Sequence, residues 1–398
     1  MTLAVEVLVA DDEIRCAHEV FRTAMVGLPP LPPDADGLWE PGRVLGARLG
    51  GALVGTANSY TGWLVVPGGD RVSHAAVTHV GVLPTHTRRG VLTALLRRQL
   101  ADIASRGEVV ATLRASQGGI YERFGYGVAT SFARLDIDTR RARLRETVPA
   151  SGPVRLVDSE TAWEIFAKIY ATANVSCTGA IDRPQYWWRL QELTHGSAGH
   201  AVVHGNPGSE DGFARYRPLS TVEWPRSSQR TVVVDDLIAT TPHAYVGLVR
   251  HLLAADIVDK VVIPAVAPDN PLRQLFTDPR AVTVSEVRDE TWLRLIDVLA
   301  ALRRRTFGPG EPVIVAVTDP ILAANTGTYR VSAEGVTRTD APADLTADVS
   351  ALATVYLGGS SWHHLALAGR VTEHHAGALD RADALFATRT QPFSGTWF

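Results

Sequence analysis

The stretch VGVLPTHTRRGVL (residues 80–92) joins the apolar end of a predicted strand to a predicted helix that begins at Gly90. Two arginines, Arg88 and Arg89, stand directly before that glycine. The first N–H groups of a helix have no partner within the helix, and the helix dipole is positive at this end. Basic side chains oppose that dipole and need a compensating anion, for which a pyrophosphate is suitable. The alternative is a solvated helix start without a ligand.

The residues around this stretch predict mixed α/β structure. Periodicity and Gly/Pro breaks indicate a helix over 12–24, strands over 44–58, 63–66 and 75–82, a helix over 90–105, and strands over 109–114 and 129–137. Several antiparallel strands before a strand–helix–strand step differ from a doubly wound Rossmann pattern. A Pro/Gly break at 148–153 then separates a second α/β stretch.

The rest of the chain predicts two more parts. The second has helices over 161–172 and 242–255 and strands over 200–204, 231–238 and 260–264; the third has a helix over 293–304 and strands over 313–319 and 327–332. With 398 residues and 45% hydrophobic content, the chain is long enough for two or three cores.

Composition excludes several classes of protein. A net charge of −3 gives no general attraction to nucleic acid or to an anionic membrane. The two cysteines, Cys16 and Cys177, are too far apart in sequence for a paired motif. No apolar run approaches the ~20 residues of a membrane span, and the acidic N-terminal stretch does not look like a signal peptide. We therefore expect a cytoplasmic protein without nucleic-acid partners or a membrane span.

Two motifs resemble those of GNAT acyltransferases. Residues 80–92 are similar to the acetyl-CoA loop of that family, although Thr93 stands where many members have Gly or Ala. The segment SQGGIYERFGY (residues 116–126) resembles the part of the fold where a tyrosine precedes a Gly-aromatic pair. Together with the three-part length and the aromatic C-terminus, they resemble the enhanced intracellular survival (Eis) acetyltransferases. This resemblance implies an α+β chain of two tandem GNAT-like domains followed by a sterol-carrier-protein-like domain.

The resemblance also implies domain roles and site residues. Residues 1–147 would bind acetyl-CoA, residues 148–290 would be a degenerate GNAT-like domain, and residues 291–398 would supply the C-terminal carboxylate. Tyr121 would be the catalytic acid and the carboxylate of Phe398 the base, which together permit direct acetyl transfer to an amine. The cofactor-binding residues would be Val80, Gly81, Val82, Arg88, Arg89, Gly90, Val91, Leu92, Thr93, Ser116 and Gln117. Family members form hexamers, so a homo-oligomer is expected.

The acceptor amine is predicted from fewer residues. Trp39 and His79 are the candidate contacts, and the first loop offers Asp34, Asp36 and Glu40 as acids for a cationic substrate. The end of the first helix, where relatives that acetylate aminoglycosides present an acid, reads TAMV (residues 23–26). The absence of that acid weighs against broad aminoglycoside acetylation and favours hydrophobic amines or peptide lysines as acceptors.

Two other classes of function stay open at this point. A non-catalytic acyl-CoA or lipid-binding protein could keep the loop and lose turnover, and a protein-interaction scaffold would leave the loop unexplained. The pairs His363-His364 and His374-His375 lack carboxylates or thiolates at ligand spacing, so no metal is expected.

Overall fold

The computed structural model of the chain describes residues 2–172, 177–196 and 199–398. Two compact units emerge. The first consists of Met1–Thr130, Cys177–Tyr186 and Asp289–Phe398, and the second of Ser131–Ser176 and Trp187–Arg288. The boundaries expected at 147/148 and 290/291 remain a prediction, because these units combine segments from different parts of the chain.

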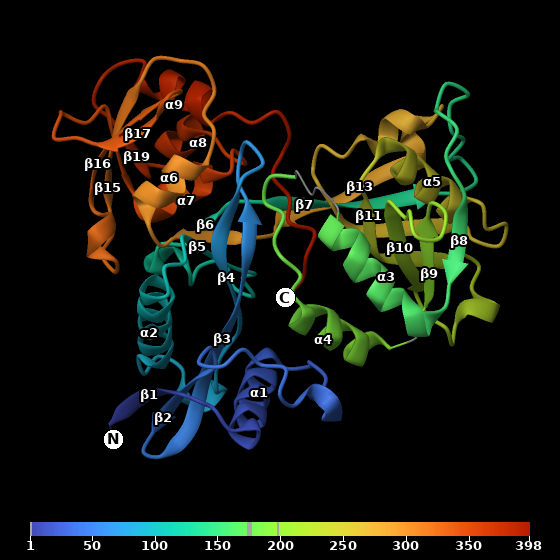
Figure 1. Cartoon of the computed structure of the whole chain (residues 1–398), viewed down its shortest axis with the longest axis horizontal. Helices are drawn as coiled ribbons and strands as arrows, with labels where there is room; N and C mark the ends of the chain where they lie inside the picture. Colours follow the sequence, from blue (N-terminus) through green and yellow to red (C-terminus); the bar gives the residue numbers. More distant parts are fainter. Residues whose placement is uncertain (1, 173–176, 197–198) are drawn as a thin grey trace. The chain divides into compact units, whose positions relative to one another are not determined.

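A seven-stranded sheet forms the part of the first unit that carries the predicted acetyl-CoA loop (Figure 1). Its strand order is β1-β2-β3-β4-β5-β14-β6. The elements are β1 (Leu3–Val7), α1 (Asp11–Met25), β2 (Leu45–Leu49), β3 (Ala52–Val65), β4 (Arg71–Val82), α2 (Val91–Ser105), β5 (Val110–Leu113), β6 (Gly127–Val128) and β14 (Trp292–Leu295). The helices and turns predicted from residues 12–105 therefore form close to their expected positions.

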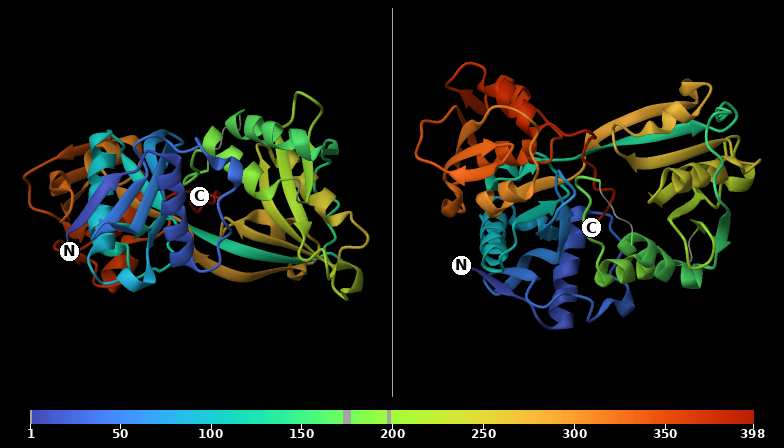
Figure 2. Two further views of the ribbon diagram at one scale, coloured as in Figure 1. Left: turned by 90° about the horizontal axis from the view of Figure 1, so that it is seen from below. Right: turned by 45° about the horizontal axis from the view of Figure 1, so that its top comes forward.

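The two helices α1 and α2 cover opposite faces of this sheet (Figures 1 and 2). Thr56 pairs with Gly81, and a Cβ on Gly81 would lie 3.1 Å from Cα of Phe21 in α1. A Cβ on the neighbouring Gly55 would lie 2.7 Å from Val91 Cγ1 in α2. Since successive residues of a strand point to opposite faces, glycine lets each helix approach the sheet closely.

The third predicted part forms a second sheet in the same unit. Its strand order is β17-β16-β15-β18-β19, and α7 packs on β6 and β14 of the first sheet. The elements are α6 (Val298–Arg304), β15 (Val313–Thr318), β16 (Gly327–Ser332), β17 (Gly335–Arg338), β18 (Leu345–Asp348), α7 (Val349–Tyr356), α8 (Trp362–Leu367), β19 (Val371–Glu373) and α9 (Ala378–Phe386). A continuous apolar core joins Leu293 and Leu295 of β14 to this sheet.

The helix predicted over 293–304 is wrong in its first half. Residues Trp292–Leu295 form β14, which inserts between β5 and β6, and the helix begins only after Asp297. Asp297 caps it, because its side chain accepts a hydrogen bond from the N–H of Ala300 (2.9 Å). The sequence predicted this strand as part of the helix, because periodicity does not distinguish a buried strand from a buried helix in a short apolar run.

The second unit is built around another seven-stranded sheet, of order β13-β7-β12-β11-β10-β9-β8. Its elements are β7 (Ser131–Asp138), β8 (Val154–Val157), α3 (Ser159–Thr172), β9 (His200–His204), β10 (Gly212–Pro218), β11 (Thr231–Ala239), α5 (Pro242–Leu253), β12 (Lys260–Val266) and β13 (Val282–Asp289). The helix α4 (Gln185–His195) was not predicted. The order β11-α5-β12, with parallel β11 and β12, repeats the order β4-α2-β5 of the first unit.

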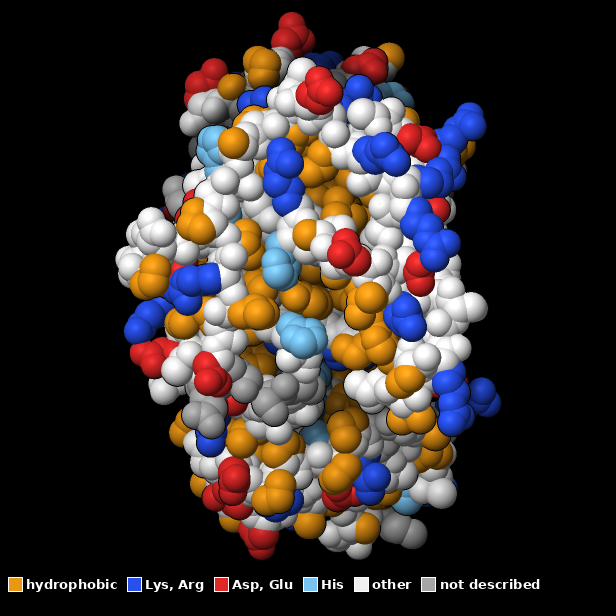
Figure 3. All heavy atoms as spheres, turned by 90° about the vertical axis from the view of Figure 1, so that its right-hand side faces the viewer, with side chains coloured by type: hydrophobic (Ala, Val, Ile, Leu, Met, Phe, Trp, Pro, Cys, Tyr) orange, Lys and Arg blue, Asp and Glu red, His pale blue; other side chains and the backbone are white. Residues whose placement is uncertain are grey.

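The helices and one face of the molecule (Figure 3) bear on binding to a membrane or to a charged partner. None of the helices in the described ranges is long and apolar enough to cross a bilayer. On the face drawn in Figure 3, hydrophobic side chains and histidines gather centrally, and charged side chains of both signs surround them. This mixture agrees with the small net charge of −3.

Candidate active site

The loop between β4 and α2, where the sequence predicts an anion site, leads into a helix start without a side-chain cap. Gly90 occupies the N-cap of α2 with a φ of 78°, and no side chain caps the helix. The first main-chain helical hydrogen bond is donated by Ala94, so the N–H groups of residues 91–93 remain for a ligand. Arg88 and Arg89 are exposed beside them, and neither forms an ion pair with any residue the structure describes. This arrangement suits a pyrophosphate.

Strands β4 and β5 separate next to this loop. Their parallel pairing ends at Val77 opposite Leu113, whereas β4 continues to Val82. Val80, Gly81 and Val82 therefore extend beyond β5 while they remain beside β3 on the other side. Ser116 and Gln117 are exposed just after β5. An open strand edge of this kind can pair with an amide-containing ligand as an added strand.

His79 lies at an irregularity in β4. The register between β3 and β4 shifts between Thr56 and Asn58, and His79 has a φ of 50°, which is rare for a residue with a side chain. Burial, followed by repulsion from His18, lowers the pKa of His79 to about 3. At neutral pH, His79 is therefore an uncharged imidazole.

An unbroken series of ring contacts connects His79 to the C-terminus. The ring centroids of His79 and Trp39 are 5.6 Å apart, and those of Trp39 and Tyr186 are 5.5 Å apart. Tyr186 lies 5.6 Å from Tyr60, which lies 5.9 Å from the ring of Phe398. The structure thus brings together Trp39, His79 and Phe398, which are far apart in the sequence.

Tyr121 follows the same end of β5 as Ser116 and Gln117. Its side chain is 5% exposed, and burial raises its pKa to about 12. Its ring is 6.4 Å from that of Trp292, which pairs with Leu113 across β14 and β5. Tyr126 is fully buried, and its hydroxyl has no hydrogen-bond partner among the described residues. Tyr126 is therefore enclosed in the core, whereas Tyr121 retains slight exposure and remains the predicted acid.

The C-terminal residues are firmly docked. Thr396 is fully buried, and its carbonyl accepts two hydrogen bonds from the guanidinium of Arg114 (2.7 and 3.0 Å). Arg114 directly follows Leu113, the partner of Trp292. The end of the chain and Tyr121 are thus anchored around the same end of β5.

Two of the three acids of the first loop form ion pairs with arginines. Asp36 pairs with Arg15 (2.7 Å), and Glu40 pairs with Arg43 (3.1 Å). Asp34 is exposed on the loop. A small pocket beside His79 is lined by Ile14, Ala17, His18, Trp39, Val44, Thr56, Asn58 and His79, which include no carboxylate.

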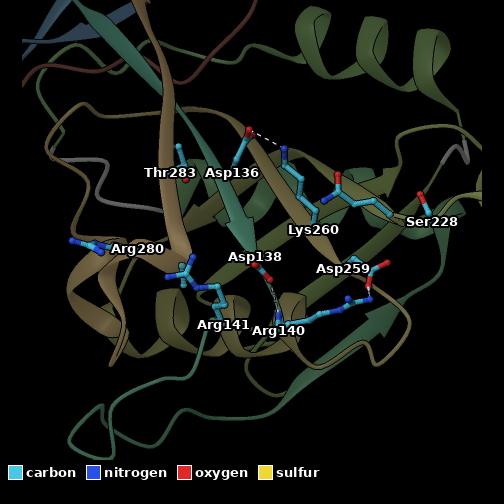
Figure 4. A pocket seen from close by; sticks show the side chains of 11 residues that line it. Asp136, Asp138, Arg140, Arg141, Ser228, Asp259, Lys260, Arg280 and Thr283 are labelled. Atoms are coloured by element: carbon cyan, nitrogen blue, oxygen red, sulfur yellow. Dashed lines mark hydrogen bonds and ion pairs between the residues drawn. The ribbon is translucent and has the colours of Figure 1, made fainter.

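The second unit differs at the corresponding helix start. Thr241 caps α5 by accepting a hydrogen bond from the N–H of Ala244 (3.0 Å), and Pro242 has no N–H. A polar pocket of about 340 Å³ in this unit, drawn in Figure 4, contains none of the predicted site residues. Its charges are largely paired, with Lys260 bound to Asp136 (2.9 Å) and Arg140 bound to Asp259. The uncapped start of α2 is therefore not repeated at α5.

Two of the histidines in the pairs at 363–364 and 374–375 contact carboxylates. Nδ1 of His363 lies 2.7 Å from a carboxylate oxygen of Asp383, and Nδ1 of His375 lies 2.9 Å from one of Asp344. Within the described part of the chain, no group of three or more His, Cys, Asp or Glu side chains is arranged to hold a metal.

Sequence reasoning missed several residues around the site. Tyr60 and Tyr186 complete the ring series, and Arg114, Arg183 and Glu290 hold the tail. They come from segments separated by about 70 residues or more in most pairs, so no local motif could have identified them.

Comparison with known proteins identifies the domains of the chain. Residues 8–129 match the model of an acetyltransferase (GNAT) domain, residues 179–295 match a second one, and residues 298–395 match a sterol carrier protein domain. These matches confirm the predicted α+β order of two tandem GNAT-like domains followed by a sterol-carrier-protein-like domain.

Relatives that match over most of the chain carry the name N-acetyltransferase. An uncharacterized N-acetyltransferase of Streptomyces avermitilis is 36% identical over 368 residues, covering 89% of each chain. The N-acetyltransferase Eis of Mycobacterium tuberculosis is 34% identical over 357 residues, covering 86% of this chain and 85% of the relative. The crystal structure of Eis1 from Mycobacterium abscessus matches with a TM-score of 0.92 at 50% identity, over 100% of both chains.

Proposed function

The chain belongs to the Eis-type GNAT N-acetyltransferases, and from this membership we propose that it transfers acetyl from acetyl-CoA directly to an amine, with Tyr121 as acid and the Phe398 carboxylate as base. GNAT acetyltransferases use acetyl-CoA, which is the co-substrate here. The observation that carries the proposal is the docking of the C-terminal residues at the end of β5, beside the strand that packs on Tyr121.

The residues around α2 would hold acetyl-CoA. The pyrophosphate would accept hydrogen bonds from the N–H groups of Val91, Leu92 and Thr93 and interact with Arg88 and Arg89. Gly90 leaves room for that approach, because no atom lies within 4 Å of a Cβ built there. The pantetheine amides would pair with the edge of residues 80–82, with Ser116 and Gln117 on the other side.

The reaction requires one base and one acid. The amine nitrogen attacks the thioester carbon, a C–N bond forms, and the amine proton passes to the Phe398 carboxylate. As the C–S bond breaks, Tyr121 donates its proton to the departing sulfur, and solvent returns a proton from the carboxylate to the phenolate. Burial keeps Tyr121 protonated at neutral pH, because its pKa of about 12 lies far above that pH.

For the acceptor, we favour an amine on an apolar body or a peptide lysine over an aminoglycoside-like polycation. A polycation needs an acidic pocket, whereas Asp36 and Glu40 are paired with arginines and the pocket beside His79 is lined by aromatic rings and uncharged groups. Trp39 and His79 would form the wall against which the acceptor packs. A hexameric assembly and a cytoplasmic location stay predictions from the sequence.

The test measures coenzyme A release from acetyl-CoA with three classes of acceptor: amines on an apolar body, a lysine peptide and aminoglycosides. We expect turnover with the first two classes, and loss of that turnover in Tyr121→Phe and in a chain that lacks Phe398. Binding of acetyl-CoA without turnover on any amine would favour the alternative, a non-catalytic acyl-CoA or lipid-binding protein. Preferential turnover of aminoglycosides would contradict the acceptor class.

A further inference from the structure

We infer that Glu290, Arg114 and Arg183 form a latch whose role is to position the C-terminal carboxylate for catalysis. This inference rests on the proposed function of that carboxylate. The three residues are positioning residues, because they contact residues 394–397, which lead directly to Phe398.

Glu290 is the centre of the latch. Its side chain is completely buried, and its two oxygens accept hydrogen bonds from the N–H groups of Ser394 (2.9 Å) and Gly395 (2.8 Å). Thr130 donates a third hydrogen bond to it (2.8 Å). A carboxylate that binds two successive main-chain N–H groups fixes the direction in which the chain leaves them.

Arg114 joins Glu290 to the next residues of the tail. One of its terminal nitrogens lies 2.8 Å from Glu290 and 2.7 Å from the carbonyl oxygen of Thr396. Its guanidinium carbon also lies 4.1 Å from the ring centre of Trp397. The planar guanidinium therefore contacts a carboxylate, a carbonyl and an aromatic face at once, which a lysine cannot do.

Arg183 completes the latch from a third segment of the chain. It donates to the hydroxyl of Thr396 (3.0 Å) and to the carbonyl of Gly395 (3.1 Å). Gly395 adopts a φ of 67°, and a Cβ there would lie 2.8 Å from Phe393, so the turn requires glycine. Residues 394–396 are thus fixed by side chains from 114, 183 and 290.

The pattern of burial argues that this device does more than hold the fold together. Trp397, the largest side chain of the tail, is 59% exposed, while the charged side chains of Glu290 and Arg114 are buried. Burial of charges is expensive and contributes little net stability, whereas apolar burial stabilises. A tail that served stability alone would bury its tryptophan.

The test is a double-mutant cycle between the latch and the carboxylate. Glu290→Gln keeps the size of the side chain but presents an amide to two N–H donors, and Arg114→Lys keeps the charge but loses the fork. Each is made in the full chain and in a chain lacking Phe398. Arg304→Gln is the matched control, because Arg304 also contacts a carboxylate and a main-chain carbonyl, those of Asp70 and Arg71, but at the surface.

In the full chain, we expect both latch variants to lower kcat about 10- to 100-fold with the KM for acetyl-CoA changed less than about 2-fold. In the chain without Phe398, the same substitutions should change kcat less than about 2-fold, because the group they position is gone. Equal losses in both backgrounds, or full activity of both latch variants, would overturn the latch. Removal of Phe398 without any loss of kcat would instead overturn the proposed function, and the latch with it. Thermal unfolding of each variant verifies that assays are done on folded protein.

Discussion

Two tyrosines only five positions apart have different surroundings, and we propose different roles for them. Tyr121 is slightly exposed, whereas Tyr126 is fully buried with an unpaired hydroxyl. Tyr121→Phe should lower kcat by about 10²- to 10³-fold with little change in acetyl-CoA binding, because it removes only the acid. Tyr126→Phe is the matched control and should keep kcat within about 3-fold. Steady-state kinetics of both variants checks this, and equal losses would contradict the assignment of the acid.

Gly90, at the start of α2, and Gly69, between β3 and β4, both adopt a left-handed backbone conformation. Both have a positive φ, 78° and 87°, and no atom lies within 4 Å of a Cβ built on either. Alanine should therefore destabilise each by about 1 kcal/mol through backbone strain alone. Only Gly90→Ala should also weaken acetyl-CoA binding, by about 10-fold, because its methyl group would approach the pyrophosphate.

Calorimetric titration with acetyl-CoA separates these two effects. Gly69→Ala should bind like the wild type, since Gly69 lies in the turn between β3 and β4. Equal affinities of the two variants would contradict the placement of the pyrophosphate at α2.

Among the elements, β4 carries a pH-sensitive residue in its first half. His74 is fully buried, and burial, followed by the charge of Arg43, lowers its pKa to about 3. Between pH 6.5 and 3, the unfolded chain binds a proton that the folded chain does not, so the free energy of unfolding falls as the pH falls. From pH 7 to pH 5, this side chain should account for a loss of about 2 kcal/mol.

Urea unfolding at pH 7 and pH 5 measures this difference. His74→Phe removes the titrating group, so its loss between the two pH values should be smaller than that of the wild type by about 2 kcal/mol. The same pH dependence in both proteins would mean that the pKa of His74 does not differ between the folded and unfolded chains.

Elements with local signals could be predicted from the sequence. The start of α2 and the turn after β3 form where the RRG motif and the Gly/Pro break after residues 63–66 indicate them, because their conformations are set by neighbouring residues. The strand β14 was assigned to a helix because its apolar residues continue into α6. Local periodicity contains no information about the strand with which a segment pairs.

At the scale of the whole molecule, strands pair far from their neighbours in sequence. β14 inserts between β5 and β6, and β7 belongs to the sheet of the second unit. The motifs identified the family, and from it we proposed the acid and the base, but the latch joins residues 114, 183, 290 and 396. Such long-range contacts follow from the complete fold and cannot be read from spacing.

One tight contact links the first sheet to the third predicted part. A Cβ on Gly127 in β6 would lie 2.2 Å from the main-chain oxygen of Ser350 in α7. Gly127→Ala should therefore destabilise the first unit by about 3 kcal/mol, since a helix backbone must move. Denaturant unfolding measures this, with Gly119→Ala as control because no atom lies within 4 Å of its Cβ. Equal stability of the two variants would show that α7 can move away from β6 at little cost.

We propose that the terminal carboxylate accepts the proton of the amine. The most direct measurement is kcat of a chain whose last residues are joined by peptide ligation and end in a Phe398 carboxamide, beside an identically ligated chain with the free carboxylate. The amide keeps the ring of Phe398 against Tyr60 and removes only the base. We expect kcat to fall by at least about 10²-fold with acetyl-CoA binding unchanged. An amidated chain as active as the carboxylate form would contradict the account.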